Sequence, residues 1–204
     1  MEIIHVEALV RGRVVVIRRD PKRLLIGFHG YGETAEVHAG ELQQIPGAEA
    51  WTIVAVQALH PFYIRSDQRV VGSWMTSLDR ELAIEDNLGY VRNVLGEFPA
   101  RERLVFAGFS QGASMAYRAA AESSCNGLIS LGGDLPDDVV PKISQLPRIL
   151  IGRGETDEWF TAEKLKNNLR SLDRHPVEVV EFAGGHEWSA AFRQRAGTFL
   201  SSVG

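Results

Sequence analysis

A single serine stands between two glycines in the segment Gly-Phe-Ser-Gln-Gly-Ala, residues 108–113, directly after an apolar run. This pattern is typical of a sharp strand-to-helix turn that lifts a serine hydroxyl above a sheet, where the glycines permit close backbone contacts. A glycine-rich turn that merely contains a serine has the same spacing. A serine hydroxyl is a weak nucleophile, so it needs a base to accept its proton and a third group to orient that base. If Ser110 is a nucleophile, the chain must also supply a histidine and a carboxylate.

Both groups are available further along the chain. His186, in the segment Phe-Ala-Gly-Gly-His-Glu-Trp, follows the last predicted strand and is the predicted base. Asp157, in Gly-Arg-Gly-Glu-Thr-Asp-Glu-Trp-Phe, is the predicted acid. The order Ser110, Asp157, His186 is the chain order of the α/β-hydrolase arrangement, and one helix and one strand between the last two fit that topology.

Three other polar residues near these motifs receive lesser roles. Glu155 is an alternative acid, and Glu158 is an alternative cap for the helix that follows. His29 lies at the end of a predicted strand, where a structural hydrogen-bonding role is favoured over a catalytic one.

Acyl transfer also requires backbone N–H groups aimed at the oxygen that becomes negative. The segment Gly-Phe-His-Gly-Tyr-Gly-Glu-Thr follows a predicted strand, and Gly30 and Gly32 would let its backbone turn close to the substrate. The backbone N–H of Tyr31 is therefore one predicted oxyanion donor. The backbone N–H of Gln111, next to the serine, is the second. A plain glycine-rich turn remains an alternative for this segment.

The elements that must position these residues alternate along the chain. Alternation of strand and helix predicts an α/β fold with a mostly parallel central sheet and helices on both faces, in which ligands bind at the carboxyl ends of the strands. A pair of strands is predicted around Arg11 and Gly12. Further strands are predicted at 23–30, 50–57, 102–109, 126–133, 147–154 and 177–185, and helices at 79–98, 111–122, 161–173 and 187–201.

Length and composition predict one soluble globular domain over residues 1–204. The chain is 45% hydrophobic and 24% charged, and its net charge of −4 argues against nucleic acid as a partner. The single cysteine cannot form an internal disulfide, and the sequence pattern predicts neither a secretory leader nor a membrane-spanning helix. A cytoplasmic protein, monomeric or homodimeric, is expected. No zinc-spaced His/Cys cluster, phosphate-binding lysine loop or dinucleotide fingerprint is found, so no metal and no cofactor are predicted.

The four segments FHGYGET, AGFSQGA, GRGETD and GGHEW together resemble the phospholipase/carboxylesterase family of short α/β-hydrolases, which includes the acyl-protein thioesterases. The resemblance extends from about residue 23 to the C-terminus. It implies an α/β-hydrolase fold with Ser110 as nucleophile, Asp157 as orienting acid and His186 as base. It also implies that the N–H groups of Tyr31 and Gln111 hold the oxyanion.

Three departures from the family pattern bear on the substrate. Tyr31 stands where the family usually has a small aliphatic residue, Arg153 where it has a histidine, and Trp159-Phe160 where it has two aliphatic residues. These changes leave the predicted triad intact. They argue against a long-chain lipid or an acylated protein as substrate, because bulky rings would fill an acyl groove.

The aromatic residues in or beside the predicted edge loops are candidates for lining a substrate pocket. Two or three of these residues are expected to line the pocket while the others pack, the set being Phe62, Tyr63, Trp74, Trp159 and Trp188. The predicted substrate-binding residues are Phe62, Trp74, Trp159 and Trp188. The segment 58–78 is the predicted lid or pocket wall, and no insertion is long enough for a separate cap domain.

These observations predict a serine hydrolase of small-molecule carboxylic esters, with thioesters as a second option, that works through an acyl-enzyme. A peptidase or amidase could use the same triad. A non-catalytic binding protein that retains the fold is the alternative from a different class.

Overall fold

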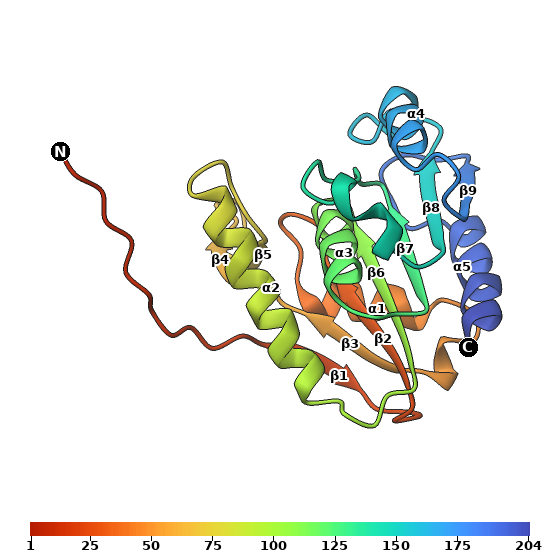
Figure 1. Ribbon diagram of the computed structural model, residues 1–204, viewed down its shortest axis with the longest axis horizontal. Coiled ribbons are helices and arrows are strands. Elements are labelled where there is room, and N and C mark those ends of the chain that lie inside the picture. The colour runs from red at the N-terminus through yellow and green to blue at the C-terminus, as the bar shows by residue number, and fades with distance from the viewer.

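The centre of the fold is a seven-stranded sheet (Figure 1). The computed structural model describes residues 1–204. Only the first strand is antiparallel to its neighbour, and every other neighbouring pair is parallel, which confirms the predicted mostly parallel sheet. In order across the sheet, the strands are β1 (Val14–Ile17), β3 (Thr52–Val56), β2 (Arg23–Phe28), β6 (Arg103–Phe109), β7 (Gly127–Leu131), β8 (Ile149–Gly154) and β9 (Val177–Phe182).

Helices cover both faces of this sheet, so the central strands read as continuous apolar runs rather than alternating ones. α2 (Arg80–Gly96), α3 (Gln111–Glu122) and α4 (Ala162–Ser171) contribute to a hydrophobic cluster of 30 buried residues on one face. α1 (Ala35–Gln43) and α5 (Ala190–Val203) contribute to a cluster of 19 on the other. Short 3₁₀ helices occupy Ala48–Ala50 and Val140–Gln145.

Besides the short 3₁₀ helices, the structure has two features that were not predicted. The first is α1, whose helix starts after an N-cap in which the Thr34 hydroxyl accepts a hydrogen bond from the N–H of Val37. The second is an antiparallel pair, β4 (His60–Tyr63) and β5 (Val70–Ser73), inside the segment 58–78. A backbone bridge between Glu33 and Gly72 joins this pair to the loop after β2.

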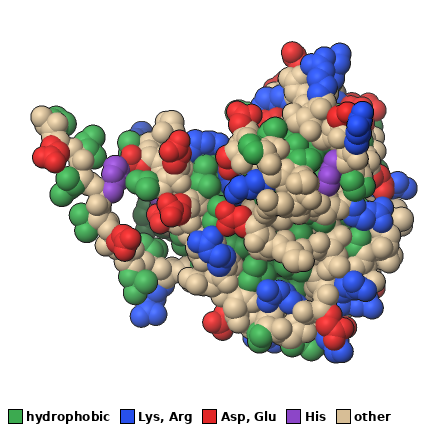
Figure 2. All heavy atoms as spheres, in the orientation of Figure 1, with side chains coloured by type: hydrophobic (Ala, Val, Ile, Leu, Met, Phe, Trp, Pro, Cys, Tyr) green, Lys and Arg blue, Asp and Glu red, His purple; other side chains and the backbone are tan.

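The predicted pair of strands around Arg11 and Gly12 is wrong in its first half. Only Val14–Ile17 forms a strand, and residues 1–12 are an exposed segment without regular structure that runs away from the body (Figure 1). Apolar side chains are spread along this segment in Figure 2. The ring of Tyr90 on α2 packs against the backbone of Gly12, and its hydroxyl donates to the carbonyl of Arg13 at 2.7 Å. At the position of the predicted turn, the chain therefore forms no turn and contacts α2 through Tyr90.

The register of the parallel strands brings their carboxyl ends to one edge. Phe109, the last residue of β6, is level with Leu131, the last residue of β7, and Gly154 of β8 is level with Phe182 of β9. The loops that follow these strands therefore open side by side. The predicted site residues lie in or beside those loops.

Candidate active site

The turn after β6 holds Ser110 in a strained conformation. Ser110 has φ 54° and ψ −120°, a combination that a residue with a side chain rarely adopts and that the surrounding structure must maintain. A Cβ on Gly108 would lie 2.2 Å from the carbonyl oxygen of Gly112, and a Cβ on Gly112 would lie 2.1 Å from the carbonyl oxygen of Phe28. Both glycines are therefore required for the turn to pack between sheet and helix, since neither position has room for even a methyl group.

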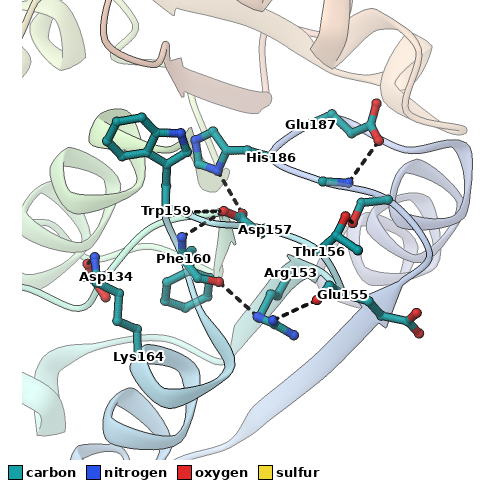
Figure 3. Close-up of polar contacts among 12 residues, drawn as sticks. Asp134, Arg153, Glu155, Thr156, Asp157, Trp159, Phe160, Lys164, His186 and Glu187 are labelled. Atoms are coloured by element: carbon teal, nitrogen blue, oxygen red, sulfur yellow. Dashed lines mark hydrogen bonds and ion pairs between the residues drawn. The ribbon is translucent and has the colours of Figure 1, made fainter.

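His186 and Asp157 form a hydrogen-bonded pair across the loops after β9 and β8 (Figure 3). His186 Nδ1 lies 2.8 Å from Asp157 Oδ2, and the other oxygen, Oδ1, accepts the backbone N–H groups of Trp159 and Phe160, each at 2.8 Å. The carboxylate is buried, whereas the imidazole is partly exposed. Three hydrogen bonds fix the orientation of the carboxylate. Because the carboxylate favours a proton on Nδ1, the Nε2 of His186 is left as the proton-accepting nitrogen.

Ser110 and His186 both lie against the turn that follows β7. A Cβ on Gly132 would lie 3.0 Å from His186 Cε1, and a Cβ on Gly133 would lie 2.4 Å from the carbonyl oxygen of Ser110. The His186 ring also lies 4.8 Å, centroid to centroid, from the ring of Phe109, which precedes the serine. The structure contains no hydrogen bond between the Ser110 hydroxyl and the imidazole. All three predicted residues thus come to one edge of the sheet, with Asp157 and His186 hydrogen-bonded and Ser110 beside them.

The loop after β2 is held by hydrogen bonds on both sides of Tyr31, whose own backbone N–H is left unpaired. Gly30 N–H donates to Glu33 Oε2 at 2.8 Å, Gly32 N–H donates to the carbonyl of Gly72 at 3.0 Å, and Gly72 N–H returns a bond to the carbonyl of Glu33 at 2.9 Å. The N–H of Tyr31, between the two glycines, has no acceptor within the protein. Burial raises the pKa of Glu33, whose carboxyl holds this loop. The bonds that hold the loop therefore leave the N–H of Tyr31 unpaired.

Gln111 connects the serine turn to the segment after β5. Its N–H is the first of α3 and has no partner within the helix, as expected for a helix N-terminus. Its side-chain Oε1 accepts the N–H of Trp74 at 2.9 Å, and its Nε2 donates to the carbonyl of Met75 at 2.8 Å. Sequence reasoning did not indicate this side-chain role, because the partners are 36 and 37 residues away.

His29 has the structural role that its position predicted. Its ring is fully buried, with Nδ1 2.7 Å from the carbonyl oxygen of Gly30 and Nε2 accepting the N–H of Ala58 at 3.1 Å. The carbonyl of His29 accepts the indole N–H of Trp74 at 2.8 Å. Burial lowers the pKa of His29, which keeps the ring neutral. The ring thus joins the end of β2 to the segment after β3.

The aromatic residues predicted to bind substrate separate into two groups. Phe62 stacks on Tyr31 with ring centroids 5.3 Å apart, and Tyr31 is 62% exposed. Trp159 is 73% exposed and lies beside His186 in Figure 3. Trp74 has no exposed surface, and Trp188 is buried in the core under α5. We therefore retain Phe62 and Trp159 as candidates for substrate contact and assign Trp74 and Trp188 to packing.

The two alternative carboxylates lie away from the imidazole. The carboxylate of Glu155 points away from His186 in Figure 3, and Glu158 is exposed. The following helix, α4, is capped instead by Thr161, whose hydroxyl accepts the N–H of Lys164. Asp157 is therefore the carboxylate that meets the histidine.

Arg153 is a residue of interest that appeared in the sequence only as a departure from a family pattern. It lies in β8, within an otherwise apolar strand, and its side chain is buried. Its guanidinium hydrogen-bonds to the carbonyls of Glu155 and Phe160 and pairs with the carboxylate of Glu181. The sequence signal is a charged residue inside a buried strand, which requires partners that the sequence does not identify.

Three further observations concern other chemistries. Burial raises the pKa of Cys125, the only cysteine, to about 12, so its thiol is protonated near neutral pH. The structure contains no group of three or more His, Cys, Asp or Glu side chains arranged to hold a metal ion. None of the helices combines the length and the apolar character that crossing a membrane demands.

Many solved structures share this architecture, although sequence comparison finds no relative. No family model matches the chain, and no curated protein matches it. The esterase PE8 aligns with a TM-score of 0.79 at 17% identity, over 95% of this chain and 100% of that one. Acyl-protein thioesterase 2 of Zea mays aligns with a TM-score of 0.75 at 16% identity, over 94% and 99%. A phospholipase/carboxylesterase of Dyadobacter fermentans aligns with a TM-score of 0.67 at 20% identity, over 94% and 97%.

These alignments cover 94–95% of this chain and 97–100% of the other chains. The fold class is therefore the α/β-hydrolase fold, with a mostly parallel sheet and helices on both faces. At 16–20% identity to this chain, these structures establish the fold, and the reaction must be argued from the site itself.

Proposed function

We propose that this chain is a serine hydrolase of the phospholipase/carboxylesterase type, which cleaves carboxylic esters through an acyl-enzyme. The observation that carries the proposal is the Asp157–His186 hydrogen bond of 2.8 Å beside Ser110, a serine in a strained strand-to-helix turn. The esterases and the acyl-protein thioesterase of the same fold support it at low sequence identity.

The first half of the reaction acylates the serine. Ser110 Oγ attacks the carbonyl carbon of the ester while His186 Nε2 accepts the hydroxyl proton. Asp157 holds the Nδ1 proton and stabilises the imidazolium that forms. The serine hydroxyl turns toward Nε2 when substrate binds, since such bonds are often absent or long in free enzymes. The imidazolium then protonates the leaving alcohol, and the acyl group stays on Ser110.

The developing negative charge is held by backbone N–H groups. Tyr31 N–H has no other acceptor, and the Gln111 N–H starts a helix whose N-terminus favours negative charge. Both are held by bonds made in advance, through Glu33 for the loop and through the Gln111 side chain for the helix start. Water then attacks the acyl carbon while His186 Nε2 accepts its proton. The bond between the acyl carbon and Ser110 Oγ breaks, the imidazolium returns the proton to Oγ, and the carboxylic acid leaves.

The substrate is a small-molecule ester, and thioesters are a second option with the same chemistry. The stacked rings of Tyr31 and Phe62 and the exposed ring of Trp159 border the site and would occupy the space that a long acyl chain needs. Hydrolysis of p-nitrophenyl esters should therefore fall as the acyl chain lengthens. A rise in kcat/KM toward long chains would contradict this choice of substrate.

The test of the reaction compares Ser110→Ala with the wild-type chain. We expect Ser110→Ala to lose both hydrolysis of short p-nitrophenyl esters and covalent labelling by a fluorophosphonate. Ser114→Ala is the matched control, because Ser114 lies four residues further on the same helix and its hydroxyl donates to the carbonyl of Asp134 instead. This control should keep both activities.

The alternatives give different results in the same experiments. Stoichiometric labelling with faster turnover of amides than of esters would favour a peptidase or amidase. Absence of labelling in folded wild-type protein would favour a non-catalytic binding protein and would contradict the proposal. Ester hydrolysis that persists in Ser110→Ala would remove the nucleophile from its assigned role.

A further inference from the structure

We propose that Arg153 is the positioning residue for the catalytic acid, and that its guanidinium clamps the acid loop, residues 155–160, in the shape that presents Asp157 to His186. This inference rests on the proposed function and deepens it. Arg153 itself would touch neither substrate nor the reacting atoms.

The contacts of the guanidinium reach both ends of the acid loop (Figure 3). Arg153 Nη2 donates to the carbonyl of Glu155 at 3.1 Å, at the start of the loop, and Nε donates to the carbonyl of Phe160 at 2.9 Å, at its end. Between these two points lies Asp157. One planar group therefore fixes the separation of the two ends, which a single point charge such as an ammonium could not do.

The same loop end is held from the other side by the catalytic acid. Phe160 gives its N–H to Asp157 Oδ1 and its carbonyl accepts the Nε–H of Arg153. The carboxylate, the Phe160 backbone and the guanidinium thus form one chain of hydrogen bonds, which continues from Oδ2 to His186 Nδ1. A shift of the Phe160 backbone would move the Asp157 oxygens and, through them, the imidazole.

Burial and charge argue that this arrangement is more than ordinary packing. The Arg153 side chain is 7% exposed, and its one acidic partner, Glu181 at 2.5 Å, is 48% exposed. Removing a cation from water is costly, and a half-exposed carboxylate offsets only part of that cost. An apolar residue in β8 would avoid the cost altogether. What only arginine supplies is the fork of donors that matches two carbonyls and a carboxylate.

The loop has anchors at its start that do not depend on Arg153. Glu155 N–H donates to the carbonyl of Phe182 at 2.9 Å, and Thr156 N–H donates to the carbonyl of Gly184 at 2.9 Å. The end of the loop has fewer anchors, namely the buried Phe160 ring and the bonds to Asp157 and Arg153. Loss of the guanidinium should therefore loosen the end of the loop, where the Asp157 acceptor sites are formed.

The test is a double-mutant cycle on kcat with a short p-nitrophenyl ester. Arg153→Met should lower kcat by about tenfold or more, because small displacements of catalytic groups have effects of this size or larger, while KM stays within about twofold. In the Asp157→Asn background, the same substitution should lower kcat by less than about twofold, since the group that Arg153 positions is no longer effective. Arg153→Lys keeps the charge but lacks the several N–H donors of the guanidinium, so its kcat should be lowered as in Arg153→Met. If the methionine variant does not fold, the lysine variant serves for the same measurement.

Arg118 provides a matched control. Its side chain is 2% exposed and its partner Asp138 is 50% exposed, nearly the values of the Arg153–Glu181 pair. It lies within α3, and its guanidinium contacts Asp138 and the Met75 sulfur instead of the acid loop. Arg118→Met should lower the melting temperature about as much as Arg153→Met and leave kcat unchanged.

Each remaining outcome separates the two proposals. If Arg153→Met lowers stability only, or lowers kcat by the same factor with and without Asp157, the positioning role is wrong while the proposed function stands. If Asp157→Asn leaves kcat unchanged in folded protein, the triad itself fails, and the positioning role fails with it.

Discussion

At the scale of one residue, the backbone conformation of Ser110 lowers the stability of the folded protein. Its φ of 54° and ψ of −120° suit glycine, yet the position carries a side chain. Such strain costs about 1–3 kcal/mol and is maintained by the surrounding contacts. The proposed nucleophile is therefore a destabilising feature of the native state.

The substitution Ser110→Gly should relieve this strain and abolish ester hydrolysis together. We expect a gain of about 1 kcal/mol, because the relieved strain exceeds the larger loss of backbone entropy that glycine suffers on folding, and a melting temperature about 2–4 °C higher. Ser110→Ala removes the hydroxyl but keeps the Cβ, so its melting temperature should match that of the wild type. Calorimetry of the three proteins checks this, and equal melting temperatures for the glycine and alanine variants would contradict it.

The residues of the site differ in how far the sequence could predict them. Ser110, Asp157 and His186 were chosen from residue type and chain order, and the structure brings them to one edge of the sheet, although their catalytic roles stay a prediction. The Arg153–Glu181 ion pair and the contacts of the Gln111 side chain could not be predicted, because they join segments that are distant in sequence. The burial of Trp74 and Trp188 likewise could not be predicted, because it depends on tertiary packing that the local sequence does not specify.

At the scale of elements, α3 packs unusually close to β2. The Cα of Gly112 faces the carbonyl of Phe28 with no room for a side chain, whereas Gly40 in α1 has no atom within 4 Å of the position of a Cβ. The close approach determines where the start of α3, and with it the serine turn, sits above the sheet.

Alanine substitutions at these two glycines should have opposite effects. Gly112→Ala places a Cβ 2.1 Å from a backbone oxygen, so we expect it to lose about 3 kcal/mol or more, or to prevent folding. Gly40→Ala should stabilise the protein by about 0.5–1 kcal/mol, because alanine favours helix and meets no atom. Urea unfolding monitored by circular dichroism measures both. A destabilised Gly40→Ala would show that the contrast does not arise from space alone.

His38 in α1 is the second feature at this scale with a measurable consequence. Its ring is fully buried against Gly27 and Trp188, and neither nitrogen makes a hydrogen bond. Burial lowers the pKa of His38 to about 3. The unfolded chain binds a proton at this position below about pH 6.5, whereas the native protein does not until about pH 3. The contribution of His38 to stability is therefore complete above pH 6.5 and is lost as the pH falls toward 3.

The variant His38→Leu should flatten this dependence. Between pH 6 and pH 4, the free energy of unfolding of the wild type should fall more steeply than that of the variant, by up to about 1.4 kcal/mol per pH unit. At pH 7.5 the variant should be as stable as the wild type or more so, since it buries no unpaired nitrogen. Urea titrations across this range test the difference, and parallel curves for the two proteins would contradict it.

The success of the element predictions followed the strength of the apolar signal. The parallel strands were predicted because both of their faces are covered and their residues are apolar throughout. The helix α1 was missed because its buried positions are Ala35, His38, Ala39 and Leu42, which have helical spacing but little hydrophobicity. The first hairpin was wrongly predicted because Arg11 and Gly12 resemble a turn. The contact of Gly12 with Tyr90 could not be predicted from the neighbouring residues, since Tyr90 is distant in sequence.

At the scale of the whole molecule, the residues of the site follow strands at different places in the sheet, some central and some at its edge. Ser110 follows β6, a central strand, whereas the acid loop and His186 follow β8 and β9, and β9 is paired on one side only. Backbone bonds from Glu155 and Thr156, and the Arg153–Glu181 ion pair, join the acid loop to β9 and the residues directly after it.

Outer strands fray at lower free energy than central ones, so this margin of the sheet should open before the molecule unfolds globally. In increasing guanidinium chloride, ester hydrolysis should disappear before far-UV circular dichroism changes, and backbone amides of β9 should exchange with deuterium faster than those of β6. Coincident loss of activity and ellipticity would contradict this order. In the expected order, Ser110 stays on an intact central strand while Asp157 and His186 separate from it together. Mild denaturation would therefore inactivate the protein reversibly, because the rest of the sheet remains folded and the outer strand can pair with it again.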